Sequence, residues 1–328
     1  MSRGTTARRI VSAASALLAA IALSVPLALV AAPERAEALS GADFDPEYII
    51  DDGLFYDAYA MSAAEIQQFL DSKIGRCLNG QCMNVFSMYY GGRGRDVSAN
   101  GVLICEAIPA GNYTVATLIY TAQVACGISA KVVLVTMQKE QSLVTSKEPS
   151  LWALSHAMGY ACPDTAPCDP SAAGVANQIV LGTRVLKAYN HAQGSRPGTT
   201  FGRAPGPQWI GYNPNSACGG TTLNIRNLAT AALYTYTPYQ PNAAALANLH
   251  STGDGCSTYG NRNFWVYYNQ WFGAPTNPAP ERIAAAHAAA GGDAGWLGPA
   301  KSGYVCGLVR GGCYREFTNA AVYASYRT

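Results

Sequence analysis

Residues 132–145 read VVLVTMQKEQSLVT, an apolar run that becomes polar towards its end. Ser129 stands just before this run and can cap a helix over residues 130–144. The β-branched residues at the start would also suit a strand, but the MQKEQ stretch consists of good helix formers. We therefore predict a buried helix that places Glu140 near its end.

Glu140 is the main candidate for chemistry. Burial beside an apolar wall disfavours the charged form of a carboxyl group and raises its pKa, so that it can donate a proton to a leaving oxygen. The other interpretation is an ordinary helix glutamate that faces solvent and pairs with Lys139 or another neighbour. Asp164 and Asp169 are interpreted as turn residues, the alternative being a second carboxylate or a metal pair. Glu148 is interpreted as loop surface, and His156 as a packed or surface histidine.

Helical patterns continue on both sides of this segment. Ser62 and Glu65 form a capping box before a helix over residues 63–74, and Gly127 can end a helix over residues 115–126. Apolar spacing predicts further helices over residues 171–189, 223–236 and 263–272. The segments rich in Gly, Pro and polar residues are predicted loops, at 75–110, 145–170 and 194–220. No clear alternating strand appears, so the fold class is predicted to be mostly α.

The first forty residues have the pattern of an export signal. Three arginines precede an apolar run over residues 10–32, and Ala36-Glu37-Ala38 is the small-x-small pattern of a cleavage site. We expect residues 1–38 to be a signal peptide removed before Leu39. The alternative is a retained membrane anchor, for which the run is long enough. The predicted localisation is secreted and cell-wall associated.

The chain has ten cysteines, all after the expected cleavage site: Cys77, Cys82, Cys105, Cys126, Cys162, Cys168, Cys218, Cys256, Cys306 and Cys313. An even number in an exported chain predicts up to five disulfides. A zinc site is the weaker reading, because no C-x-x-C pair is present, and we predict no metal. Short separation favours the pairs Cys162–Cys168 and Cys306–Cys313, and Cys218–Cys256 would bracket the helix at 223–236. The first four cysteines leave three pairings open.

The charge balance argues against a nucleic-acid partner. Residues 1–38 hold four arginines and two glutamates, so the rest of the chain has 18 basic and 18 acidic side chains. Nucleic-acid binding depends mostly on neutralising phosphates, for which a neutral chain is poorly suited. The 20 tyrosines and 5 tryptophans offer rings that suit sugars. No phosphate-binding loop is present, and no cofactor is expected.

The segment from residue 132 to residue 189 resembles the lysozyme-like domain of soluble lytic transglycosylases. The matching motifs are Glu140-Gln141-Ser142, Ala157-Met158-Gly159-Tyr160 and Ala172-Ala173-Gly174, in the family's order. Gln141 stands between the Glu and the Ser, and Met158-Gly159-Tyr160 replaces the family's Gly-Leu-Met-Gln signature. The resemblance implies a lysozyme-like helical domain with long disulfide-linked loops over residues 39–272, with Glu140 as the catalytic acid.

Longer strings resemble a group of exported actinobacterial cell-wall proteins labelled hemagglutinin-like. They are FDPEYIIDDGLFYD, MSAAEIQQFLDSK, LVTMQKEQSLVT, AMGYACPDTAPCD, YTPYQPN and GNRNFWVYYNQWFG. They span nearly the whole of the main domain. The label describes binding rather than chemistry, so this resemblance leaves both an enzyme and an adhesin open.

The C-terminal residues form a separate small unit in the sequence. Residues 273–292 are rich in Pro and Ala and are predicted to be a linker. Residues 293–328 resemble the LGFP repeat of corynebacterial and mycobacterial wall proteins, through Trp296-Leu297-Gly298-Pro299, Gly311-Gly312, Phe317 and Ala321-Val322-Tyr323. The resemblance implies attachment to an envelope glycolipid or to arabinogalactan.

Together these features predict cleavage of peptidoglycan glycan strands by a lytic transglycosylase or muramidase. Hydrolysis normally needs a second carboxylate, and its absence favours the transglycosylase route that the resemblance implies. The expected substrate-binding residues are Ser142, Met158, Gly159, Tyr160, Tyr234, Tyr236 and Trp265. The alternative is a non-catalytic protein that binds the cell wall or its glycans on the same scaffold.

Overall fold

The computed structural model describes residues 39–98, 101–163, 166–190, 202–276, 279–302, 305–308 and 312–325. The expected signal peptide, residues 1–38, lies outside the described residues. Among the residues that are described, no helix has the length and apolar character needed to cross a membrane.

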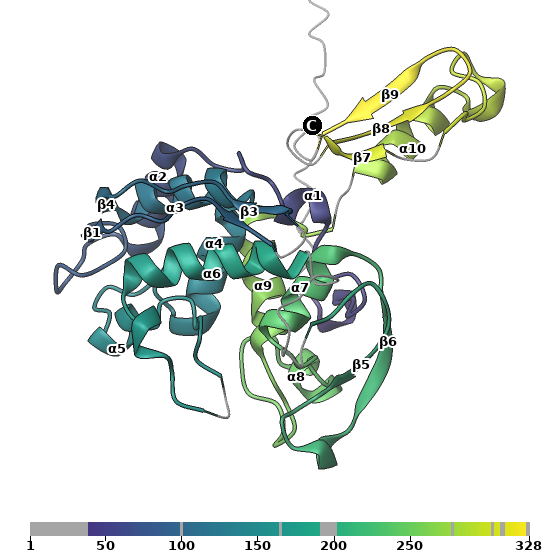
Figure 1. Cartoon of the computed structure of the whole chain (residues 1–328). Coiled ribbons are helices and arrows are strands. Elements are labelled where there is room, and N and C mark those ends of the chain that lie inside the picture. The colour runs from purple at the N-terminus through teal and green to yellow at the C-terminus, as the bar shows by residue number, and fades with distance from the viewer. Residues whose placement is uncertain are drawn as a thin grey trace, which may run out of the picture. The chain divides into compact units, whose positions relative to one another are not determined.

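Ten α-helices form in the described part of the chain (Figure 1). They are α1 (Asp52–Phe55), α2 (Ala63–Ile74), α3 (Val115–Cys126), α4 (Ala130–Gln141), α5 (Leu151–Ser155), α6 (Val175–Asn190), α7 (Leu228–Tyr236), α8 (Ala243–Ala247), α9 (Gly260–Phe272) and α10 (Ala279–Ala289). α4 packs against α3 and α9, and α6 packs against α3 and α7. Every residue of α4 from Ala130 to Gln138 is buried, so the helix forms the centre of the main core.

The local capping signals place the first long helices correctly. The Ser62 hydroxyl accepts from the Glu65 amide while the Glu65 carboxylate accepts from the Ser62 amide, and α2 covers the predicted residues. α3 ends at Gly127, which has a left-handed φ of 66°. α4 ends three residues earlier than predicted, because Ser142 takes a left-handed φ of 55°.

The fold-class prediction is wrong: the structure is mixed rather than mostly α. Helices hold 42% and strands 15% of it, and a mostly-α lysozyme-like domain is not what the chain forms. The strands are β1 (Ser87–Tyr90), β2 (Asp96–Val97), β3 (Leu103–Cys105), β4 (Gly111–Thr114), β5 (Gly206–Gly211), β6 (Gly220–Ile225), β7 (Val305–Leu308), β8 (Gly312–Glu316) and β9 (Ala321–Ala324). They form the antiparallel sheets β1-β4, β2-β3, β5-β6 and β7-β8-β9.

The strands are short, and four of them lie in segments that were predicted to be loops: β1, β2, β3 and β5. β5 and β6 pair in unbroken register from Gly206 opposite Ile225 to Gly211 opposite Gly220. Glycines at the strand ends hid this hairpin in the sequence, because Gly disfavours strands. β6 also occupies the start of the helix predicted over residues 223–236, so α7 begins only at Leu228.

Four disulfides are present in the described residues: Cys77–Cys82, Cys105–Cys126, Cys162–Cys168 and Cys218–Cys256. Two of the three predicted pairs, Cys162–Cys168 and Cys218–Cys256, are thereby confirmed. The structure also decides among the three pairings left open for the first four cysteines. The side chain of Cys306 lies outside the described residues, so the pair Cys306–Cys313 stays a prediction, although the two residues stand opposite each other in register.

The C-terminal segment has its own core cluster of buried residues, made of Ala279, Ile283, Leu297, Cys313 and Phe317. The first two lie on α10, inside the segment that was predicted to be a linker over residues 273–292. α10 packs against β8 and β9, so it belongs to the C-terminal unit. Its alanines read as linker composition in the sequence, but alanine is also the best helix former. Of α10, Ala279 and Ile283 are buried, while Ala284, Ala285 and Ala286 are exposed.

Candidate active site at Glu140

Glu140 lies in the last turn of α4, where the helix leaves the core. The residues before it are buried as far as Gln138, while the Glu140 side chain is 27% exposed. The polar MQKEQ run marks this exit in the sequence. The carboxylate is therefore partly exposed to solvent, while the helix that carries it is anchored in the core.

Lys139 pairs with Glu140, as the alternative interpretation of the sequence proposed. The Lys139 side chain is only 2% exposed, and its Nζ donates to Oε1 of Glu140. Nζ also donates to Oγ1 of Thr237 at 3.0 Å and lies 5.3 Å from the centre of the Tyr236 ring. A buried ammonium group needs such partners. Glu140 therefore neutralises the charge of Lys139 in addition to being the candidate catalytic carboxylate.

The loop that follows α5 packs its backbone directly on the Glu140 carboxylate. Gly159 has a left-handed φ of +69°, and a Cβ there would lie 2.8 Å from Oε2 of Glu140. Only glycine allows both this conformation and this approach. Gly159, one of the expected substrate-binding residues, thus lies against Glu140, and the adjacent Tyr160 is half-buried.

Gln178, on α6, holds this loop in place, and sequence reasoning missed it. Its side chain is 1% exposed. Its Oε1 accepts from the amides of Met158 and Tyr160, and its Nε2 donates to the carbonyls of Tyr160 and Ala172. All four hydrogen-bonding positions of the amide are used. The only available signal was a glutamine between Val175 and Ile179 on an apolar helix face.

Tyr236, at the end of α7, joins the same group. Its hydroxyl donates to the carbonyl of Met158. Burial raises the pKa of Tyr236 well above its ordinary value, and the charge of Glu140 raises it further. The phenol therefore stays a neutral hydrogen-bond donor beside the carboxylate at neutral pH.

Three of the other expected substrate-binding side chains are buried. Tyr234 is fully buried and donates to the carbonyl of Pro46, and Trp265 packs edge-on against Phe44. Met158 is fully buried, and its sulfur lies over Gly182 of α6. These three side chains therefore build the core around the site rather than its surface.

Backbone strain is concentrated around Glu140. Among the described residues, Ser142 and Ala161 are the two non-glycine residues with positive φ, at 55° and 58°. Ser142 is exposed and ends α4 two residues after Glu140, while Ala161 directly follows Tyr160. Such conformations are costly and tend to occur at functional sites.

No second carboxylate shares a hydrogen bond or ion pair with Glu140 within the described ranges. The carboxylate of Asp169 accepts from the amide and the hydroxyl of Ser171, which lowers its pKa. Glu148 is exposed in the loop before Pro149, and Asp164 lies outside the described residues. Among the described residues, Glu140 is thus the one carboxylate in this group of side chains.

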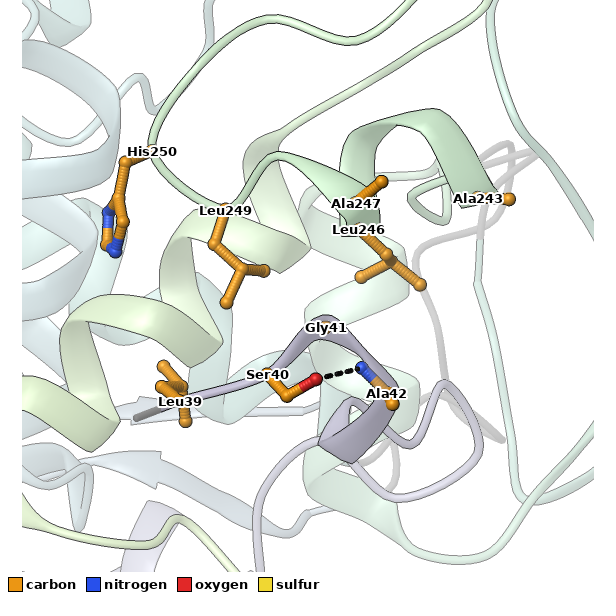
Figure 2. A pocket seen from close by; sticks show the side chains of 9 residues that line it. All are labelled: Leu39, Ser40, Gly41, Ala42, Ala243, Leu246, Ala247, Leu249 and His250. Atoms are coloured by element: carbon orange, nitrogen blue, oxygen red, sulfur yellow. Dashed lines mark hydrogen bonds between the residues drawn. The ribbon is translucent and has the colours of Figure 1, made fainter. Parts of the chain in front are cut away.

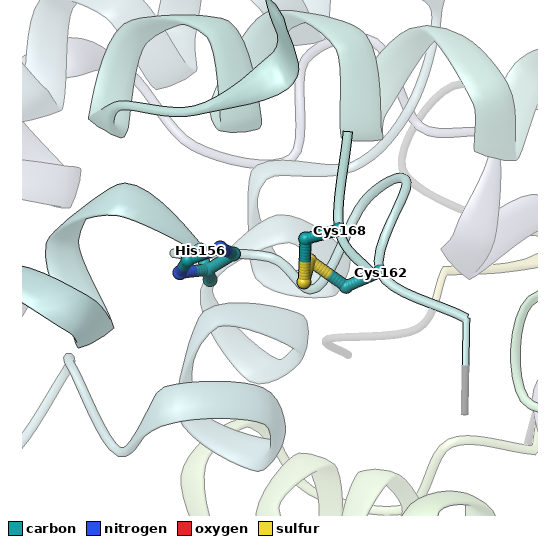
Figure 3. A group of neighbouring side chains, drawn as sticks. All are labelled: His156, Cys162 and Cys168. Atoms are coloured by element: carbon teal, nitrogen blue, oxygen red, sulfur yellow. A yellow bond between two sulfur atoms is a disulfide. The ribbon is translucent and has the colours of Figure 1, made fainter. Parts of the chain in front are cut away.

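His156 and the disulfide Cys162–Cys168 lie together beside the site, with their potential ligand atoms within 4.8 Å of one another (Figure 3). A metal would need cysteine thiolates. Both sulfurs are bonded to each other instead, so the group in this form has no thiolate to offer a metal.

A cavity of about 640 Å³ lies elsewhere, between the residues around Ser40 and α8 (Figure 2). Its lining is mostly apolar, with Leu39, Leu246 and Leu249 on its walls and His250 at its edge. None of the expected catalytic or substrate-binding residues lines it. Glu140 therefore does not line this cavity.

Comparisons with protein-family models, with curated proteins and with solved structures each found no match to this chain. The family resemblances drawn from the motifs therefore stay predictions, and any function has to be argued from the site itself.

Proposed function

We propose that the protein cleaves the glycan strands of peptidoglycan, between N-acetylmuramic acid and N-acetylglucosamine, with Glu140 as its single acid–base group. The observation that supports this most is the partly exposed carboxylate of Glu140. It is fixed between the buried ammonium of Lys139 and the backbone of Gly159. Catalytic groups need such a fixed position, held by neighbours that are themselves rigid.

The chemistry of a single carboxylate favours the lytic transglycosylase route. In the reacting state Glu140 has taken up a proton from solvent. It gives this proton to the oxygen that bridges the two sugars, and the bond from this oxygen to C1 of muramic acid breaks. The resulting carboxylate then accepts the proton of the muramic acid 6-hydroxyl, whose oxygen bonds to C1. The products are a free N-acetylglucosamine 4-hydroxyl and a 1,6-anhydromuramic end, and Glu140 returns to its protonated state.

A second function has one observation in its favour. The charge of Glu140 is compensated by Lys139, and its carboxylate is in contact with a loop backbone, which also suits a purely structural carboxylate. In that case the protein binds the glycans of the wall without cutting them. Incubating the protein with purified peptidoglycan decides between the two: soluble fragments with anhydro ends support the enzyme, and bound protein without soluble fragments supports the binder.

We also propose that the protein is secreted and held at the cell wall through its C-terminal unit. Tyr314 on β8 and Tyr323 on β9 are cross-strand partners whose rings stack 5.3 Å apart, and Tyr323 is strongly exposed. Exposed stacked rings suit the faces of envelope sugars. N-terminal sequencing of protein from culture medium should begin at or near Leu39, and an intact Met1 would contradict secretion by cleavage.

A further inference from the structure

Trp152, on the short helix α5, is an exposed aromatic side chain close to the candidate site. It is 64% exposed, and its neighbour Leu151 is exposed as well. The large side chain of tryptophan loses much favourable burial when it stays in water. An indole kept at the surface on a short helix therefore needs an explanation.

One side of the indole is covered by His156. The two rings lie 3.9 Å apart between centroids, at 31° to each other. Nδ1 of His156 is within hydrogen-bonding distance of the Ser155 hydroxyl and the Trp152 carbonyl. The imidazole also lies close to the disulfide Cys162–Cys168 (Figure 3). The histidine therefore holds the indole in one orientation.

The segment that carries Trp152 is also fixed at both ends. Before α5, the amide of Leu78 donates to the carbonyl of Lys147 and the side chain of Asn79 donates to the carbonyl of Pro149, both from the loop closed by Cys77–Cys82. After α5, the amide of Gly174 donates to the carbonyl of Ser155. A rigid aromatic side chain loses little conformational entropy when it binds a ligand.

Trp152 is connected to Glu140 through a single turn. The amide of Gly159 donates to the carbonyl of His156 at 2.8 Å, and Gly159 is the residue that packs on the Glu140 carboxylate. The histidine that backs the indole and the glycine that touches the carboxylate thus belong to the same hydrogen-bonded turn. Trp152 and Gly159 are thus carried by one continuous segment, α5 and the turn that follows it.

We propose that the exposed face of Trp152 is a binding platform for a pyranose ring of the glycan strand. The choice of a glycan as the ligand rests on the proposed function. A sugar ring has an apolar face of C–H groups that can stack on an indole while its hydroxyl groups stay in water. A sugar ring therefore suits the indole of Trp152, which His156 covers on one side and which is otherwise exposed to solvent.

The test uses the full chain and tetra-N-acetylchitotetraose as the probe, with binding measured by calorimetry in a Glu140→Gln background so that no cleavage can occur. Trp152→Ala should weaken binding at least about tenfold, and Trp152→Phe should restore part of it. Trp209→Ala is the matched control, because Trp209 is 58% exposed on β5. Equal affinities of Trp152→Ala and the background protein would overturn the proposal, as would loss of affinity in Trp209→Ala alone.

The two proposals fail separately. If Trp152→Ala binds the oligosaccharide normally while the parent releases anhydro fragments from peptidoglycan, the platform is wrong and the proposed cleavage stands. If the parent releases nothing but binds the oligosaccharide through Trp152, the cleavage is wrong and the platform stands. If the background protein shows no binding at millimolar oligosaccharide, the platform is overturned whatever the cleavage assay gives.

Discussion

The α-carbon of Gly159 lies against the carboxylate of Glu140, with so little space that a methyl group there would come within 2.8 Å of Oε2. Gly159→Ala should therefore displace the carboxylate in addition to straining a φ of +69°. Gly80→Ala is the matched control, because Gly80 has a φ of +73° and nothing within 4 Å of the added carbon. The strain alone costs about 1–2 kcal/mol of unfolding free energy.

We expect Gly159→Ala to lose more stability than Gly80→Ala in denaturant unfolding, and to lose cleavage of peptidoglycan as well. Gly80→Ala should keep its activity once its folded fraction is taken into account. Equal losses of stability in the two variants, with full activity in both, would show that the contact between Gly159 and Glu140 has no consequence.

Gln178 should be the most sensitive polar residue of α6. Gln178→Leu leaves the amides of Met158 and Tyr160 without their buried acceptor, which costs about 1–3 kcal/mol for each unsatisfied group. Asn177→Leu is the control, because Asn177 is its half-buried neighbour and bonds only to carbonyls of the preceding turn. A thermal unfolding midpoint of Gln178→Leu that equals that of Asn177→Leu would contradict the assigned role.

Asp96 should contribute a pH-dependent part of the stability. Burial alone would raise its pKa, but the hydrogen bond and charge of Arg184 and the charge of Arg93 outweigh this and lower it below the ordinary 3.8. A lowered pKa in the folded state means that the contribution is fully present above the ordinary pKa. It is lost as the pH falls through the lower, folded-state value.

The variant Asp96→Asn should therefore be less stable than the parent at pH 7, by about 1–3 kcal/mol, and the difference should shrink below pH 4. The control is Glu106→Gln, which removes an exposed ion pair with Arg95 that contributes about 0–1 kcal/mol. Chemical unfolding across pH 2–7 measures both variants. A difference between parent and Asp96→Asn that stays constant with pH would refute the linkage.

Local signals predicted six of the ten α-helices in the described part of the chain, and missed α1, α5, α8 and α10. The β5–β6 hairpin was missed because it depends on contacts distant in sequence. The capping pairs around Ser62 and Glu65, and the glycine stop at Gly127, depend on residues within a few positions of each other, so α2 and α3 were predicted to the residue. β5 and β6 depend on pairing across a loop, and their short, glycine-ended runs gave no clear alternation.

The same distinction holds for the site. Glu140 and its partner Lys139 are adjacent in the chain and were both named from sequence, and Gly159 was named as an expected substrate-binding residue through the motif resemblance. The second partner of Lys139 is Thr237, 98 residues away, and the loop is held by Gln178 from another helix. No local pattern encodes these contacts, because they arise only when α4, α6 and α7 pack together.

The C-terminal unit should begin at α10 rather than at residue 293. A chain cut after residue 278 should keep the thermal midpoint of the main core. A chain cut after residue 292 leaves Ala279 and Ile283 without Leu297 and Phe317, their partners in the C-terminal core cluster, and should aggregate more readily. Light scattering during heating compares the two. Equal behaviour of both truncations would contradict the inclusion of α10 in the C-terminal unit.

The central claim is that Glu140 is the catalytic acid–base group, and the most direct measurement is the release of 1,6-anhydro muropeptides from purified peptidoglycan, quantified by mass spectrometry. Glu140→Gln keeps an acceptor for Lys139 but has no proton to exchange, so release should fall at least about a hundredfold. Glu148→Gln, an exposed loop variant, should match the parent. Full release of anhydro fragments by folded Glu140→Gln would contradict the account.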